Sequence, residues 1–310
     1  MLSVFVETLP FFALIGVGYG AGRSGFFSEE ATAHLTKFVF YFALSAMIFR
    51  FAANLSLEDV FDWRLVGAYL GASAAVYLLA TAVALFRGRG LEEAAVEAQC
   101  AVIGNVGFLG LPMLALLLGE AAVGPVMLVL SADLIVFGSL IVILIAGSRD
   151  GRLSVGVLRT VGLGLVRNPM IMSLALGLAW SRLALPVPAP AAAFLEILGA
   201  AATPGALFAI GASLATKSAE RFRVALWLSG CKLVLHPLAV AFALLVLVGA
   251  EGFSARVIIA AAALPVAGNV YILAQHYRVA PQRVSSAILV STVISIVSVS
   301  FVIALLGGNM

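Results

Sequence analysis

The chain has little charge and little cysteine. Only 11% of its 310 residues are charged, and its two cysteines, Cys100 and Cys231, both fall within apolar stretches. Two such cysteines predict neither a disulfide framework nor a metal site. The sequence also lacks a phosphate-binding loop and the His-Glu-x-x-His and Gly-x-Gly-Asp patterns of membrane proteases. These absences exclude an ATP-driven pump and argue against an enzyme, and we expect no cofactor.

Most of the chain is apolar: 63% of the residues are hydrophobic, and the mean hydropathy is +1.15. A bilayer-spanning helix needs about 20 apolar residues. The sequence therefore predicts an all-α polytopic membrane protein with ten transmembrane helices and connections too short for a soluble domain. The ten predicted spans are Leu2–Gly20, Ala31–Ala53, Arg64–Phe86, Ala94–Leu118, Ala122–Ala146, Asn168–Leu185, Ala191–Ala215, Phe222–Val248, Arg256–Tyr277 and Val284–Leu306.

The basic residues fall almost entirely on alternate connections. Of 18 Lys and Arg, one set lies on the connections of one side: Arg23, Lys37, Arg87, Arg89, Arg149, Arg152, Arg159, Arg167, Lys217, Arg221, Arg223, Arg278 and Arg283. The other side holds Arg50, Arg64, Arg182 and Arg256, and Lys232 lies inside the eighth span. Because basic loops stay in the cytoplasm, both termini are predicted outside the plasma membrane. No basic cluster is dense enough to predict a nucleic-acid partner.

The two halves of the chain resemble each other. A shift of 159 residues brings Pro10 onto Pro169, Gly18 onto Gly177 and Phe49 onto Phe208. This predicts a first five-helix repeat at 1–146, a cytoplasmic basic loop at 147–167 and a second repeat at 168–310. An odd number of spans inverts the second copy in the membrane, and inverted repeats are typical of secondary transporters.

Two predicted spans contain residues that break helices. The breaking residues are Gly104, Asn105, Gly107 and Pro112 in the fourth span, and Pro265, Gly268 and Asn269 in the ninth. Proline lacks an N–H and displaces the carbonyl four residues before it. In hydrocarbon, such groups need another partner. Two interrupted spans at corresponding positions indicate a binding site; the alternative is a pair of proline kinks with glycines for close packing.

These stretches also carry a family resemblance. The segment GNVGFLGLP at 104–112 resembles the "GNxGFLGLP" of the auxin efflux carrier family, which includes plant auxin exporters and bacterial organic-acid carriers. The segments ATPGALFAIGASL at 202–214 and AILVSTVIS at 287–295 are similar to that family's seventh and tenth spans. Two departures are Val106, where threonine is common, and Ser45, where proline is usual. The second departure weakens the expectation of a kink in span two.

The resemblance implies that spans four and nine cross at their interruptions near the membrane midplane. Spans one, two, six and seven would form a scaffold that dimerises, and spans three to five and eight to ten a transport unit that moves as an elevator. In the family the crossing holds the substrate carboxylate, which carries over to Asn105 and Asn269 with the adjacent Gly104 and Gly268. Half-helix N-termini favour such an anion without a buried cation.

Other polar residues in apolar spans are candidates for coupling to H⁺ or Na⁺ or for pairing with a counter-ion. These are Asp133, Lys232, Glu97 and Gln275. Lys232 pairs in this interpretation with the substrate or with Asp133; alternatively it reaches the membrane interface. His236, four residues further on, is expected to be a neutral, packed histidine.

Three functions remain open. The first is a carrier of small organic anions, such as malate, malonate or an auxin-like acid. The short central connection favours a bacterial metabolite carrier, and hence the inner membrane. The second is a sodium-coupled symporter with the architecture of the bile-acid symporters. The third is a membrane sensor or channel.

Overall fold

In a computed structural model, residues 2–55, 62–150, 155–215 and 222–307 are described, and this part of the chain is helical. By length and composition, seven helical segments are able to cross a membrane, or eight if one bent pair is counted as a single span. The prediction of an all-α polytopic membrane protein is therefore confirmed. Three of the basic residues used for the topology, Arg152, Lys217 and Arg221, lie outside the described residues.

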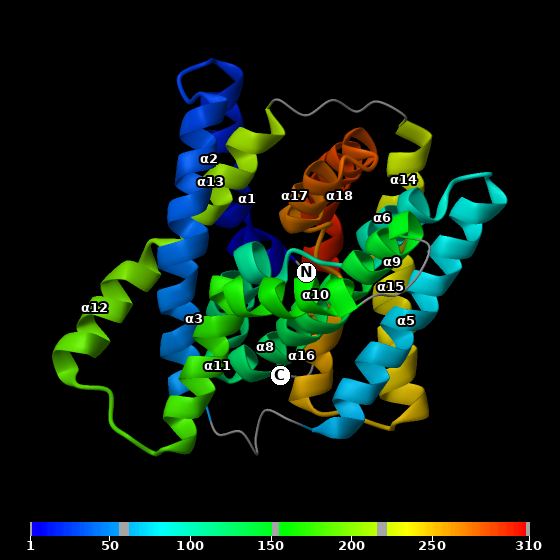
Figure 1. Ribbon diagram of the computed structural model, residues 1–310. Coiled ribbons are helices and arrows are strands. Elements are labelled where there is room, and N and C mark those ends of the chain that lie inside the picture. The colour runs from blue at the N-terminus through cyan, green and yellow to red at the C-terminus, as the bar shows by residue number, and fades with distance from the viewer. Residues whose placement is uncertain (1, 56–61, 151–154, 216–221, 308–310) are drawn as a thin grey trace.

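The helices pack in two groups (Figure 1). The first group contains α1 against α13, and α11 and α12 against α3. Its members are α1 (Leu2–Arg23), α2 (Glu29–Phe38), the π-helical turn η1 (Val39–Ala43), α3 (Leu44–Ala53), α11 (Pro169–Arg182), α12 (Ala189–Ala200) and α13 (Ala202–Leu214). Figure 1 shows α12 at the edge of the molecule.

The second group packs around α8 and α16, with α5 against α6 and α15, and α14 against α18. Its first half has α5 (Trp63–Phe86), α6 (Leu91–Val102), the π turn η2 (Val106–Gly110), α7 (Leu111–Leu118), the 3-10 turn η3 (Glu120–Ala122), α8 (Val123–Ala132), the π turn η4 (Asp133–Phe137) and α9 (Gly138–Asp150). Its second half has α14 (Phe222–Gly230), the π turn η5 (Cys231–Leu235), α15 (His236–Ala241), the π turn η6 (Phe242–Leu247), α16 (Phe253–Ala262), α17 (Gly268–Tyr277) and α18 (Pro281–Gly307).

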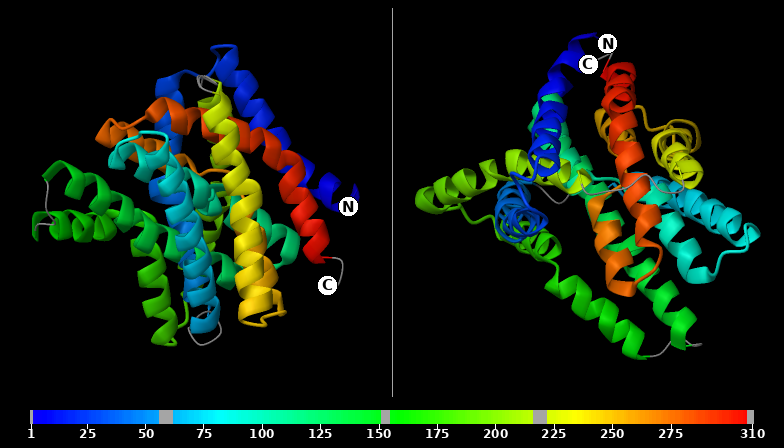
Figure 2. Two further views of the ribbon diagram at one scale, coloured as in Figure 1. Left: turned by 90° about the vertical axis from the view of Figure 1, so that its right-hand side faces the viewer. Right: turned by 90° about the horizontal axis from the view of Figure 1, so that it is seen from above.

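The two groups also touch each other. The N-terminal helix α1 lies beside the C-terminal α18 in both views of Figure 2. At this contact the hydroxyls of Thr8 and Ser300 share a hydrogen bond of 2.7 Å, and both residues are buried. The first and the last helices of the chain thus join the two groups.

The segment 147–167 is not the loop that the sequence predicts. Its first residues continue α9, and α10 (Val155–Arg167) occupies its second part. The sixth predicted span also differs, because α11 has 14 residues and reaches membrane length only together with α10, across a bend of 70°. Asn168 causes this boundary: its side chain accepts from the N–H groups of Met170 and Ile171 and caps α11.

Span two carries a π turn although it has no proline. The turn η1 ends just before α3, and the Ser45 hydroxyl donates to the carbonyl of Phe40. A serine hydroxyl can thus satisfy a carbonyl that the widened turn leaves without its usual partner. The helix of span two is therefore irregular near Ser45, although proline is absent there.

Two corresponding glycines make the same contact in the two halves of the chain. A Cβ atom on Gly18 would overlap the backbone of Phe208, and one on Gly177 would overlap the backbone of Phe49. Gly177 and Phe208 are the partners of Gly18 and Phe49 under the shift of 159 residues. The contact is therefore reciprocal, and glycine is required because the helices approach too closely for a side chain; at Gly177 the Cβ of Ala52 also occupies the space.

We expect Gly18→Ala to destabilise the protein by about 1–3 kcal/mol, because the added methyl group overpacks the contact of α1 with α13. Gly20→Ala is the matched control in the same helix, since a Cβ there meets nothing within 4 Å. Thermal melting of the purified variants in detergent measures the difference. Equal melting temperatures for the two variants would contradict the close contact.

Candidate functional site

The two interrupted segments meet each other. Gly104 and Val266 form an antiparallel bridge, in which the Asn105 N–H donates to the Pro265 carbonyl at 2.8 Å and the Ala267 N–H to the Ile103 carbonyl at 3.1 Å. The segments satisfy each other's backbone groups, as a low-dielectric interior requires. We call this contact, residues 103–105 with 263–267, the crossing.

Two half-helices begin at the crossing. The turn η2 starts at Val106 and α17 starts at Gly268, each two residues beyond its bridge residue. The first N–H groups of a helix have no partner within that helix, and they form its positive end. Because the bridge is antiparallel, the two half-helices leave it in opposite directions. Both positive ends therefore face the crossing.

Asn105 and Asn269 lie at these two helix starts. The side chain of Asn105 is buried, whereas Asn269 is half-buried and its Oδ1 atom is enclosed without a hydrogen-bond partner in the described part of the chain. Gly268 is exposed, and a Cβ there would meet nothing within 4 Å. The α17 start thus combines open space with an amide oxygen that lacks a partner.

The other predicted breaking residues have different roles. Pro265 lies inside the break between α16 and α17, and its carbonyl accepts from Asn105. Pro112 lies seven residues beyond Asn105, at the start of α7 and directly after η2, and the backbone of Gly110 and Leu111 before it stays helical. The expected break at Pro112 is replaced by the wide turn η2. Gly107 belongs to that turn, and a Cβ there would overlap the Met170 side chain of α11.

Five buried polar residues form one cluster behind the crossing: Tyr69, Ser73, Asp133, Lys232 and His236. The Tyr69 hydroxyl donates to Asp133 Oδ1 at 2.6 Å, and Ser73 Oγ lies 2.9 Å from His236 Nε2. Lys232 Nζ lies 3.1 Å from His236 Nδ1. The cluster joins α5, the start of η4, η5 and α15, so it links spans three, five and eight.

The hydrogen bonds of this cluster fix the tautomer of His236. Lys232 has only donors, so His236 Nδ1 accepts and Nε2 carries the proton, which it donates to Ser73. Tyr69, four residues before Ser73 in α5, donates to Asp133. Two neighbouring residues of one helix face thus bond to the two sides of the cluster. This assignment makes His236 neutral, as the sequence predicts.

The cluster contacts the crossing through Lys232, which donates to the Ala262 carbonyl at the C-terminal end of α16. The Lys232 ammonium and the Asp133 carboxylate also attract each other. Asp133 Oδ2 is buried without a hydrogen-bond partner in the described part of the chain. A Cβ on Gly104 would lie 3.3 Å from Lys232 Nζ, which leaves little room for a larger residue. The Lys232 ammonium therefore holds the helix end that leads into the crossing.

The π turns explain how these residues face inward. Asp133 is the first residue of η4. Lys232 lies within η5, and this turn ends just before His236 and Pro237. A π turn inserts one residue into the helical repeat and redirects the side chains around it, and such turns are frequent at functional sites. The apolar sequence around Asp133 and Lys232 does not disclose these turns.

Glu97 and Gln275 lie away from this cluster. Glu97 is buried and pairs with Arg283 of α18 at 2.8 Å and with Arg87. Gln275 is exposed, and its Nε2 donates to the Tyr271 hydroxyl at 2.9 Å. The structure thus brings Asp133 and Lys232 to the crossing, whereas Glu97 fastens α6 to α18.

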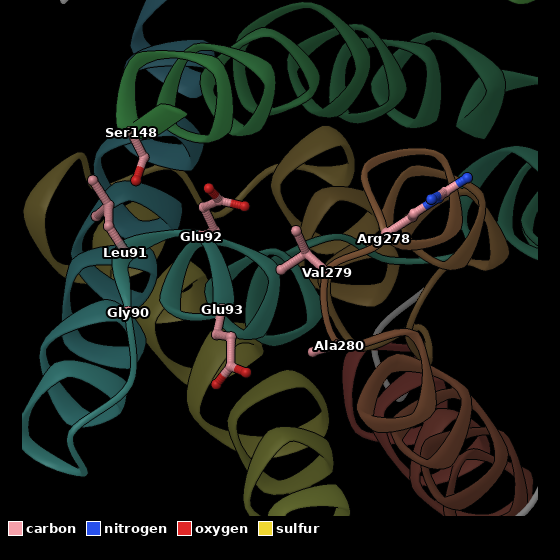
Figure 3. Close-up of a pocket in the computed structure, with 8 residues that line it drawn as sticks. All are labelled: Gly90, Leu91, Glu92, Glu93, Ser148, Arg278, Val279 and Ala280. Carbon is pink, nitrogen blue, oxygen red and sulfur yellow. The ribbon is translucent and has the colours of Figure 1, made fainter. Parts of the chain in front are cut away.

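A pocket of about 410 Å³ opens elsewhere, between the α5–α6 turn, the end of α9 and the α17–α18 turn. Figure 3 shows Glu92 and Glu93 at this pocket, with the Arg278 side chain extending away from them. Glu92 pairs with Arg149 and Glu93 with Arg283. Two carboxylates make this pocket unfavourable for an organic anion.

Sequence reasoning missed Tyr69, Ser73 and an aromatic contact. Tyr69 and Ser73 are four residues apart in an apolar helix, as are Lys232 and His236, and this shared spacing was the available signal.

The rings of Phe40 and Phe108 are stacked with centroids 6.2 Å apart, and they join η1 of the first group to η2 of the second. Nothing in the sequence pairs these two phenylalanines.

No group of three or more His, Cys, Asp or Glu side chains within residues 2–55, 62–150, 155–215 and 222–307 is arranged to hold a metal ion. Asp133 is the one carboxylate of the cluster behind the crossing. The chemistry available at the crossing is therefore hydrogen bonding and charge compensation.

Comparison with known proteins gives two findings. A family model described as "Membrane transport protein" matches residues 3–303. A protein of Rhizobium meliloti (strain 1021), named "Putative malonate transporter", is 30% identical over 306 residues, which cover 97% of this chain and 95% of that protein. The chain is thus similar to that protein over nearly its full length.

We expect Tyr69→Phe to cost about 1–3 kcal/mol of stability, because Asp133 loses the hydroxyl that donates to its buried carboxylate. Tyr41→Phe is the matched control, since Tyr41 is 54% exposed. Thermal melting in detergent compares the two. If the Tyr69 variant melted with the control, the hydrogen bond would contribute nothing.

We expect Glu97→Gln to destabilise the protein by about 1–3 kcal/mol, because the buried Arg283 keeps Glu93 as a partner but loses the charge of Glu97. Glu120→Gln, at an exposed position, is the control. Chemical unfolding of both variants in mixed micelles gives the difference in free energy. A loss no larger than in the control would show that Arg283 is held by its other contacts.

Proposed function

Because the chain belongs to the auxin efflux carrier family of membrane transport proteins, we propose that it is a secondary carrier of small organic anions of the malonate and malate class. The substrate carboxylate binds at the crossing, between the helix starts that follow Asn105 and Ala267. The printed name of the Rhizobium relative favours a small dicarboxylate over an aromatic acid.

The observation that carries this proposal is the pairing of the two breaks. The bridge between Gly104 and Val266 brings the starts of η2 and α17 to one place, and each start has N–H groups that no helical carbonyl accepts. A carboxylate receives charge-assisted hydrogen bonds from such groups. Two helix starts stabilise the negative charge of an organic acid, so the site needs no basic side chain.

The asparagine side chains complete this site. Each amide offers two donors and one acceptor. The enclosed Oδ1 of Asn269 lacks a donor, and a hydroxyl or a protonated carboxyl of the substrate supplies one. The amide groups of Asn105 and Asn269 donate to the substrate carboxylate. Gly268 keeps the approach open because a side chain there is absent.

The ten-helix inverted repeat is part of the same proposal. The eight membrane-length candidates and the two interrupted segments, 91–118 and 253–277, add up to ten spans. The reciprocal contacts of Gly18 with Phe208 and of Gly177 with Phe49 support a two-fold relation between the repeats. A pseudo-two-fold axis of this kind places the crossing near the membrane midplane.

The two packing groups support elevator-type alternating access. In the described part of the chain each ion pair joins two residues of one group, as with Arg283 and Glu97 in one and Arg50 and Glu196 in the other. Beside the crossing the groups meet through apolar contacts, such as the stacked Phe40 and Phe108. Apolar surfaces slide more readily than bonded ones. We propose that the first group is the scaffold and that the second carries the substrate across the membrane.

The setting is a bacterial inner membrane, with the basic connections in the cytoplasm and both termini outside. In Figure 1 the turns at 23–28 and 278–280 lie toward one end and those at 183–188 and 248–252 toward the other, which supports alternate sides. A homodimer through the scaffold is the proposed assembly. The exposed α12 side chains, Phe194 at 63% and Ile197 at 76%, suit such a partner or lipid.

The proposal is tested with purified protein in proteoliposomes on a solid-supported membrane. A panel of mono- and dicarboxylates is applied with and without Na⁺ and at two pH values, and uptake of labelled malonate detects electroneutral transport. Saturable transport of one acid supports the carrier. Absence of both signals for every acid would contradict it and favour a sensor.

We expect Asn105→Ala and Asn269→Ala each to abolish transport while expression and melting stay near those of the parent protein. The reason is that each change removes amide hydrogen bonds to the carboxylate but leaves the bridge backbone intact. Asn54→Ala, at an exposed position, is the control. Wild-type affinity in both crossing variants would show that the substrate binds elsewhere.

A further inference from the structure

The crossing gathers negative helix ends as well as positive ones. The helices α6 and α16 end at Val102 and Ala262, directly before the crossing. The last carbonyls of a helix have no intrahelical partner and form its negative end. In carriers with broken helices, such carbonyls are where a coupling cation binds. A cation at the ends of α6 and α16 is therefore the physical complement of an anion at the starts of η2 and α17.

In this chain the Lys232 side chain reaches the C-terminal end of α16. Lys232 is fully buried, and its ammonium donates to the Ala262 carbonyl and to His236 Nδ1. The neighbouring Ala261 carbonyl and Lys232 Nζ both lie within 3.4 Å of the position of a Cβ atom on Gly104. The ammonium is thus beside the carbonyls that a free cation would seek.

Asp133 compensates the charge of this ammonium. The carboxylate attracts Lys232, and its Oδ1 atom accepts a hydrogen bond from Tyr69. Buried charges persist when they are paired and hydrogen-bonded. With one cation and one anion the cluster is neutral, and a further Na⁺ would add an uncompensated charge.

We propose that the Lys232 ammonium is a tethered cation that occupies the place of a coupling Na⁺ at the crossing, so that the carrier moves its anion without sodium. The inference deepens the proposed function and rests on it for the statement about transport. The statement about ion binding rests on the contacts of Lys232 alone. It gives Lys232 a positioning role, because this residue acts on the site through the Ala262 carbonyl at the end of α16.

The binding statement is tested without any substrate. Melting of the purified protein is compared in NaCl and in choline chloride at equal ionic strength. The parent protein should show no Na⁺-specific shift. Lys232→Ala leaves the Asp133 carboxylate and the Ala262 carbonyl around an empty space, so Na⁺ should stabilise this variant with a shift that grows with the logarithm of its concentration.

Cys231→Ala is the matched control, since Cys231 is the buried neighbour of Lys232 in η5 and lies outside the cluster. It should show no response to Na⁺. A Lys232→Ala protein that folds only in the presence of Na⁺ also supports the proposal. A Na⁺-specific shift in the parent protein overturns it, as does a variant that stays indifferent to Na⁺ or fails to fold with and without it.

The transport statement is tested by malonate uptake into proteoliposomes with Na⁺, K⁺ or choline outside. Equal uptake by the parent protein in the three media supports the tethered cation, and a requirement for Na⁺ overturns it. If no acid of the panel is transported, the proposed function fails. The melting comparison still decides whether Lys232 fills a cation site.

Discussion

The structure depends on one constraint, which is that backbone N–H and C=O groups in a nonpolar surrounding need a partner. Two helices of this chain are interrupted, and each interruption satisfies the other through the bonds from Asn105 to Pro265 and from Ala267 to Ile103. Lys232 of span eight adds a hydrogen bond to the Ala262 carbonyl, which lies just before the crossing.

Helix ends of both signs meet at the crossing. Helix starts face the crossing and favour an anion, while helix ends there carry partial negative charge. Lys232 donates to the Ala262 carbonyl, at the end of the helix that leads into the crossing, and Asp133 lies close enough to attract this ammonium. The buried ammonium therefore stabilises the negative end of α16, whereas the helix starts at Val106 and Gly268 have no charged side chain of their own.

Different kinds of contact hold the two helix groups together and join them to each other. Glycines bring α1 and α13, and α11 and α3, into backbone contact within the first group. Buried ion pairs, such as that of Glu97 with Arg283, fasten the helices of the second. Between the groups, Phe40 on Phe108 and Met170 against Gly107 are apolar contacts beside the crossing, and a hydrogen bond between Thr8 and Ser300 joins α1 to α18. The contacts within a group are thus closer or charged, whereas those beside the crossing are apolar.

Much of this protein was accessible from the sequence, because hydropathy and helix-breaking residues act locally. The apolar runs identified the class, and the Gly-Asn and proline pattern located both breaks. The pairs at a shift of 159 residues, such as Gly18 with Gly177, pointed to contacts that prove reciprocal. Other features arise only when distant segments meet. The partners of Lys232 and Asp133, the roles of Tyr69 and Ser73, and the pairing of Glu97 with Arg283 depend on π turns and on helix packing. Local spacing does not encode them, so only the tertiary structure decided which buried polar groups meet at the crossing.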